Sequence, residues 1–185
     1  MANVLVPLAQ GCEELEAITI TDLLTRAGFN VVSAGLDDQP VTASRGMVLM
    51  PRINLDQAMQ QDFDMIVLPG GLPGADHLNR DPRIHALLKK IHADGKYVAA
   101  ICAAPKVLAD AGLLQGKQAT SFPGAIKNIQ DYDIDYQEQS VVIDDRIITS
   151  RGPGTAMDFA LTLIELLAGK AKRDEVEAPL QRPAA

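Results

Sequence analysis

Short apolar runs alternate along the chain with longer stretches in which apolar residues recur at helical spacing. Four runs have the length and flanking residues of buried strands: 3–9, 29–35, 64–71 and 97–101. They are apolar throughout rather than alternating, so both faces of the sheet they form must be covered. This pattern predicts a parallel sheet.

The stretches between the runs predict helices. In the first of them, Leu15, Ile18 and Leu23 share one helical stripe. Asn54 has the position of an N-cap for a short helix. The expected helices cover 13–28, 54–60, 81–95, about 104–111 and 154–169.

Several segments fall outside this alternation. Residues 37–53 predict a hairpin, residues 133–151 predict antiparallel pieces, and 118–122 predicts a further strand. The polar segment 72–80 is expected to be a surface loop. The tail 170–185 is charged, and its last few residues are expected to fray.

Strands that alternate with helices predict a doubly wound α/β domain, and the length fits a single domain over residues 1–185. In this architecture ligands bind at the carboxyl ends of the strands. Three such ends carry unusual residues: 11–16, Gly70-Gly71 and Cys102. We therefore expect the functional site where these three segments meet.

Composition narrows the classes of partner. The net charge of −7 and the absence of tryptophan argue against nucleic acid as the main partner. Two cysteines, Cys12 and Cys102, are too few for a disulfide scaffold and fit a reducing compartment. The first residues suggest a strand rather than a signal peptide, and no run reaches the roughly 20 apolar residues that span a bilayer. We expect a cytoplasmic protein that does not enter the membrane.

Cys102 lies between a predicted strand and a predicted helix. The unpaired N–H groups at a helix N-terminus lower the pKa of a thiol. Ala100, Ala103 and Ala104 leave room for the sharp turn that presents a nucleophile. The sequence therefore predicts a reactive thiolate. The alternative is a buried cysteine that acts as a small apolar residue, and it stays open at this point.

A cysteine nucleophile usually has a proton carrier beside it. We expect His77, His85 and His92 at the surface, on a loop and on an amphipathic helix. Glu16, one turn into the first helix, is the better candidate, because a neighbouring thiolate would force its carboxyl to keep a proton. The alternative is a solvated helix acid. The Gly70-Gly71 turn either aims N–H groups at an oxyanion or is a plain tight turn.

Five segments together resemble the ThiJ/PfpI superfamily, in particular the branch of the parkinsonism-associated protein deglycase and its bacterial relative YajL. The resemblance runs from about Val4 to Leu180 and rests on GCEELEA, RAGFNVVSAGL, VLPGG, AAICAAP and SRGPGTAMDFAL. It implies a flavodoxin-like fold and a homodimer. The site residues it implies are Cys102 as nucleophile, Glu16 as its protonated partner, and the N–H groups of Gly71 and Ala103 as an oxyanion pocket.

The chain departs from the animal members of this branch at two positions. Phe122, in TSFPGAI, stands where they have a histidine, so a mechanism that needs an imidazole there is in question. Cys12 stands where they have alanine, and we expect it to be inert rather than disulfide-bonded to Cys102. Arg26 and Arg45 match arginines of the family, and surface salt bridging is the simpler role for both.

Two functions fit this cysteine. The first is a deglycase or glyoxalase that acts on small dicarbonyls such as methylglyoxal and glyoxal, or on their early glycation adducts with proteins or nucleotides. The second is a redox sensor or an oxidation-dependent chaperone that uses oxidation of Cys102. A protease or amidotransferase is disfavoured, because no histidine is expected beside the cysteine. No metal or organic cofactor is implied, since the chain shows no cluster of zinc ligands.

Overall fold

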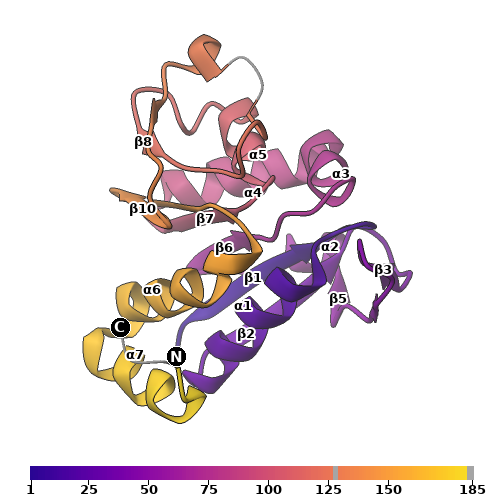
Figure 1. Ribbon diagram of the computed structural model, residues 1–185. Helices are drawn as coiled ribbons and strands as arrows, with labels where there is room; N and C mark the ends of the chain where they lie inside the picture. The colour runs from indigo at the N-terminus through magenta and orange to yellow at the C-terminus, as the bar shows by residue number, and fades with distance from the viewer. Residues whose placement is uncertain (127–128, 183–185) are drawn as a thin grey trace.

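A seven-stranded sheet forms the centre of the protein in the computed structural model, which describes residues 1–126 and 129–182. The strand order is β10-β11-β7-β6-β1-β2-β5, and neighbours are parallel except in the β10–β11 hairpin at one edge (Figure 1). The predicted, mostly parallel sheet is therefore confirmed. Its strands are β1 (Asn3–Leu8), β2 (Asn30–Gly35), β5 (Ile53–Asn54), β6 (Met65–Leu68), β7 (Tyr97–Ile101), β10 (Val141–Asp144) and β11 (Ile147–Ser150).

Helices cover both faces of this sheet (Figure 1). Successive residues of a strand point to opposite faces, so Val4 and Val6 join the apolar cluster under one helical layer and Leu5 joins the other cluster. The first layer comprises α1 (Glu14–Arg26), α6 (Ala156–Ala168) and α7 (Lys170–Glu177). The second comprises α2 (Leu55–Ala58), α3 (Gly74–Arg80), α4 (Pro82–Ala93) and α5 (Pro105–Asp110). The doubly wound, flavodoxin-like architecture is confirmed.

Smaller elements complete the fold. The hairpin expected in 37–53 is present as β3 (Val41–Thr42) and β4 (Val48–Leu49). Asn54 caps α2 as expected, and its side chain and that of Gln57 form a capping box. The strand expected at 118–122 is shorter than predicted: β8 (Gln118–Ala119) pairs in parallel with β9 (Asp135–Tyr136). The 3-10 turns are η1 (Ile129–Tyr132), η2 (Pro153–Thr155) and η3 (Ala178–Leu180).

One expectation about helices was wrong, and one helix was not anticipated. Residues 72–80, expected as a loop, contain α3, which is short and polar and is held by the burial of Ala75 and Leu78. The charged tail contains α7, whose Val176 is buried in the cluster that includes α6 residues. The fraying expected for the last residues concerns 183–185, which lie outside the described residues. Within the described residues, no helix combines the length and apolar character that crossing a bilayer requires.

Candidate active site

Three segments after neighbouring strands meet at one edge of the sheet. Strands β7, β6 and β1 are adjacent and parallel, so their carboxyl ends lie side by side. Cys102 follows β7, Gly70-Gly71 follows β6, and the loop after β1 leads into α1, which carries Glu16. The structure thus brings together the residues that the sequence singled out.

The backbone of Cys102 adopts a left-handed conformation, with φ of 63°. Such a conformation costs a residue other than glycine about 1–3 kcal/mol and is found mostly at functional sites. Two hydrogen bonds hold it: the N–H of Cys102 donates to the carbonyl of Ser150 at 2.9 Å, and its own carbonyl accepts from the N–H of Phe122 at 2.8 Å. Cys102 is therefore fixed on a tight turn between β7 and α5.

The two glycines after β6 allow the backbone to approach this turn. A Cβ on Gly70 would lie 2.6 Å from the Cβ of Cys102, so no larger residue fits there. Gly71 has a φ of 87°, and a Cβ on it would lie 2.3 Å from the backbone nitrogen of Glu13. The N–H groups of Gly71 and Ala103 both hydrogen-bond the thiol of Cys102. The PGG turn therefore serves a close contact and is more than a tight turn.

Glu16 is completely buried beside the thiol. Its Oε2 accepts a hydrogen bond from the N–H of Gly70 at 2.8 Å, and its carboxyl also hydrogen-bonds the Cys102 thiol. Its Oε1 has no nitrogen or oxygen partner among the described residues. Glu16 is therefore not a solvated helix acid, because the Gly70 N–H and the Cys102 thiol surround its carboxyl in place of water.

Burial shifts both members of this pair in the same direction. It raises the pKa of Glu16 to about 7, although the hydrogen bonds from Gly70 and Cys102 oppose the rise. Burial also raises the pKa of Cys102 to about 12, the charge of Glu16 adds to the rise, and the N–H groups of Gly71 and Ala103 oppose it. The N–H group of Ala103 at the start of the helix does lower the thiol pKa, as expected, but burial and the charge of Glu16 outweigh it, so the net shift is a rise. Because both pKa values are raised, the pair loses its first proton well before its second and carries one shared negative charge between the two steps.

An open pocket of about 410 Å³ gives access to the sulfur, which belongs to a residue only 8% exposed. The sequence had placed Cys102, Gly71 and Ala103 here. It missed most of the wall, because the wall comes from loops far apart in the chain. Glu13 belongs to the segment 11–16 expected at the site, and Arg45, expected only at the surface, also lines the pocket. The other lining residues were not predicted for the site: Ser44, Leu72, Phe122, Pro123, Gly124, Ala125 and Pro153.

The remaining polar candidates lie outside this pocket. His77 Nδ1 lies 3.1 Å from the carbonyl oxygen of Gln10, and His85 Nε2 lies 2.8 Å from that of Asn79. Cys12 is a buried free thiol, and burial raises its pKa to about 11, which fits an inert residue. Arg26 forms a surface salt bridge with Asp22.

A bound metal ion needs several ligand side chains close together. In residues 1–126 and 129–182, no three His, Cys, Asp or Glu side chains come close enough together to hold a metal ion.

The fold and the site define the class: a flavodoxin-like α/β protein with a cysteine on a strained strand-to-helix turn and a buried carboxyl beside its sulfur. The sequence narrows this class further. The chain belongs to the DJ-1/PfpI family, whose family profile matches residues 2–166.

Individual relatives agree with this assignment. The chain is 37% identical over 179 residues to the glutathione-independent glyoxalase DJR-1.2 of Caenorhabditis elegans, covering 97% of this chain and 95% of that protein. The crystal structure of Drosophila melanogaster DJ-1beta superposes with a TM-score of 0.94, at 42% identity and with 99% of each chain covered. Protein DJ-1 homolog A of Arabidopsis thaliana is 42% identical over 180 residues, 96% of this chain, but this chain spans only 46% of its length.

Proposed function

We propose that the protein is a cysteine-dependent enzyme of carbonyl stress, which converts small dicarbonyls such as methylglyoxal and glyoxal, or their early adducts on proteins and nucleotides, into hydroxy acids. The observation that carries the proposal is the Cys102–Glu16 pair, which shares one charge at the base of an open pocket. The name of the nematode relative, a glutathione-independent glyoxalase, supports the same chemistry.

The shared charge explains how a buried thiol reacts. When the proton of Cys102 moves to Glu16, the carboxyl becomes neutral and no longer repels the sulfur. The N–H groups of Gly71 and Ala103 then stabilise the thiolate. The reactive form is thus reached by proton transfer inside the pair, without an imidazole at position 122.

The sulfur then attacks the aldehyde carbon of the substrate, forming a C–S bond while the electron pair of the C=O bond moves to oxygen. N–H groups of Gly71 and Ala103 stabilise this oxyanion until it takes the proton that Glu16 received from Cys102, which returns Glu16 to a carboxylate. Glu16 removes the hydrogen on the attacked carbon as a proton, giving an enediol, and a proton returned to the neighbouring carbon leaves a thioester. Water hydrolyses the thioester to a 2-hydroxy acid and the free thiol. One carbon is oxidised and its neighbour reduced, so no external oxidant is needed.

The direct test is lactate formation from methylglyoxal by the wild type, Cys102→Ser and Cys12→Ser. We expect Cys102→Ser to lose activity and Cys12→Ser to keep it, because Cys12 lies outside the pocket. Equal rates in the wild type and Cys102→Ser would remove the proposal. On a glycated peptide, release of the unmodified amine by the wild type alone would extend the activity to deglycation.

A second function uses the same sulfur as a redox sensor or as the switch of an oxidation-dependent chaperone. It is favoured by the hydrogen-bonding groups around Cys102, which would also stabilise a sulfinate, with protonated Glu16 as a donor. Mild peroxide followed by mass spectrometry separates the two functions. Gain of two oxygens on Cys102 alone, in a protein that turns over no dicarbonyl, would favour the sensor.

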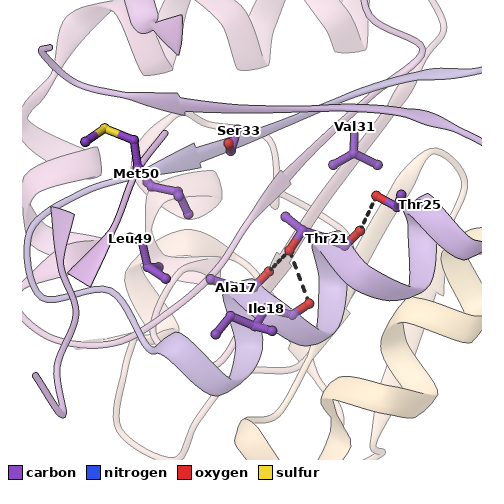
Figure 2. A pocket seen from close by; sticks show the side chains of 9 residues that line it. Ala17, Ile18, Thr21, Thr25, Val31, Ser33, Leu49 and Met50 are labelled. Carbon is purple, nitrogen blue, oxygen red and sulfur yellow. Dashed lines mark hydrogen bonds between the residues drawn. The ribbon is translucent and has the colours of Figure 1, made fainter. Parts of the chain in front are cut away.

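We further propose that the protein is a homodimer located in the cytoplasm. An apolar surface around α1 and the β3–β4 hairpin supports the dimer, and its exposed members are Leu15, Ile18, Met47, Val48 and Met50. Figure 2 shows Ile18, Leu49 and Met50 around a hollow there, with the hydroxyls of Thr21 and Thr25 bonded to carbonyls of their own helix. Sedimentation of the wild type and Ile18→Asp tests the dimer, and a monomeric wild type would contradict it.

A further inference from the structure

The pocket above Cys102 has walls of different character on its two sides. In the sheet order β11-β7-β6-β1, Cys102 follows β7, so loops after β11 lie on one side of it and loops after β1 on the other. On the β1 side, Glu13, Ser44 and Arg45 line the pocket with charges of both signs. This wall therefore has no preference of charge that would select an anionic or a cationic substrate.

The other wall is apolar. It consists of Phe122, Pro123, Ala125 and Pro153, which we call the apolar flank. Phe122 is 50% exposed, and Leu72, in the loop between β6 and α3, adds a second apolar side chain that is 60% exposed. Large apolar side chains left in solvent beside a nucleophile are typical of a binding surface.

Phe122 is held in a fixed position relative to the sulfur. Its N–H donates to the carbonyl of Cys102 at 2.8 Å, and its own carbonyl accepts from the N–H of Ala125 at 2.9 Å. Its ring lies against Gly152, where a Cβ would approach Cδ2 to 3.4 Å. The backbone of Phe122 is therefore fixed, and its half-exposed ring has Gly152 on one side and can offer an aromatic face to a planar group.

The pocket is also larger than a small dicarbonyl requires. A volume of about 410 Å³ lies within the range of pockets that enclose a ring-sized ligand, about 300–1,000 Å³. Methylglyoxal would leave most of this space, and the whole apolar flank, in contact with water.

From these observations we propose that the preferred substrates are 2-oxoaldehydes that carry an aryl group, with the dicarbonyl at Cys102 and the aryl ring against Phe122. This inference rests on the proposed function for the reaction itself, and it adds the substrate class. Aryl contacts of this kind change binding by up to about tenfold.

The first experiment compares kcat/KM for phenylglyoxal, methylglyoxal and glyoxal. The wild type is expected to prefer phenylglyoxal over methylglyoxal by about tenfold. Phe122→Ala is expected to lose most of this preference, measured as the ratio of kcat/KM for phenylglyoxal to kcat/KM for methylglyoxal. Ile143→Ala, which truncates a similarly exposed apolar side chain outside the pocket, is the matched control and keeps the preference. A wild type without preference, or a preference that survives in Phe122→Ala, overturns the inference.

The second experiment does not depend on turnover. Cys102 is alkylated with 2-bromoacetophenone and with bromoacetone, and each rate is divided by the rate of the same reagent with free glutathione. We expect the normalised rate to favour the aryl reagent by about tenfold in the wild type and not in Phe122→Ala. If no dicarbonyl is turned over but this preference is present, the proposed function fails and the aryl-binding flank stands. Equal normalised rates in the wild type would overturn the inference that the apolar flank binds aryl groups, whatever the enzyme assay gives.

Discussion

Replacing Glu16 by glutamine keeps the size of the side chain and removes its titration. In the folded protein burial raises the pKa of Glu16 from 4.5 to about 7. Between these two pH values the folded protein therefore keeps a proton that the unfolded chain has released. A carboxyl of this kind contributes stability that is fully present below pH 4.5 and is lost as the pH rises to about 7.

The size of the effect follows from the same two values. One pKa unit corresponds to about 1.4 kcal/mol, so the rise from 4.5 to about 7 corresponds to about 3 kcal/mol. We expect the free energy of unfolding of the wild type, relative to Glu16→Gln, to fall by about this amount between pH 4.5 and pH 8. Urea unfolding of both proteins at several pH values measures it.

Glu14→Gln is the matched control. Glu14 also lies on α1, but its pKa is lowered, whereas that of Glu16 is raised. Burial of Glu14 is outweighed by hydrogen bonds from backbone N–H groups and from Ser44, which lower its pKa. The wild type should therefore gain stability relative to Glu14→Gln as the pH rises through the acid range. If the difference between the wild type and Glu16→Gln does not change from pH 4.5 to pH 8, Glu16 titrates normally and the coupled pair does not exist.

Three further substitutions test the supports of the site and of the fold. Gly71→Ala should cost about 3 kcal/mol or more, because the left-handed backbone and the 2.3 Å approach to Glu13 both oppose a Cβ. Gly28→Ala, which has a φ of 83° and open space around it, isolates the backbone part at about 1 kcal/mol, and equal losses in the two variants would show that the crowding is unimportant. Asn54→Ala should cost about 1 kcal/mol through the lost capping box while leaving Cys102 alkylation unchanged, and a slowed alkylation would contradict that independence. Urea unfolding measures the free energies.

The order of strands and helices could be predicted from the sequence because apolar runs and helical stripes are local signals. The ends of β7 and β6 could be placed for the same reason, and with them Cys102 and Gly71. Helix α3 escaped prediction because it is short and polar, and only the burial of Ala75 and Leu78 in the folded protein holds it. Tertiary contacts, rather than helix propensity, decided this segment.

The electrostatics of the site could be predicted only in part. A raised pKa of Glu16 was expected, but from repulsion by a neighbouring thiolate; burial raises this pKa instead, and the hydrogen bond from Cys102 opposes the rise. The raised pKa of Cys102 did not follow, because burial of the sulfur depends on loops that close over it from distant parts of the chain. The hydrogen bond from the N–H of Gly70 to Glu16 joins residues 54 positions apart in the sequence, so no local pattern predicts it.

The most direct test of the shared charge is the pH dependence of iodoacetamide alkylation at Cys102. The first proton leaves the pair at about pH 7, so we expect alkylation of the wild type to rise with a midpoint near that value. In Glu16→Gln the thiol has no acceptor for its proton, and the midpoint should move to higher pH. A midpoint of about 8.5, the value of a free thiol, in both proteins would contradict the claim that Glu16 and Cys102 act as one titrating unit.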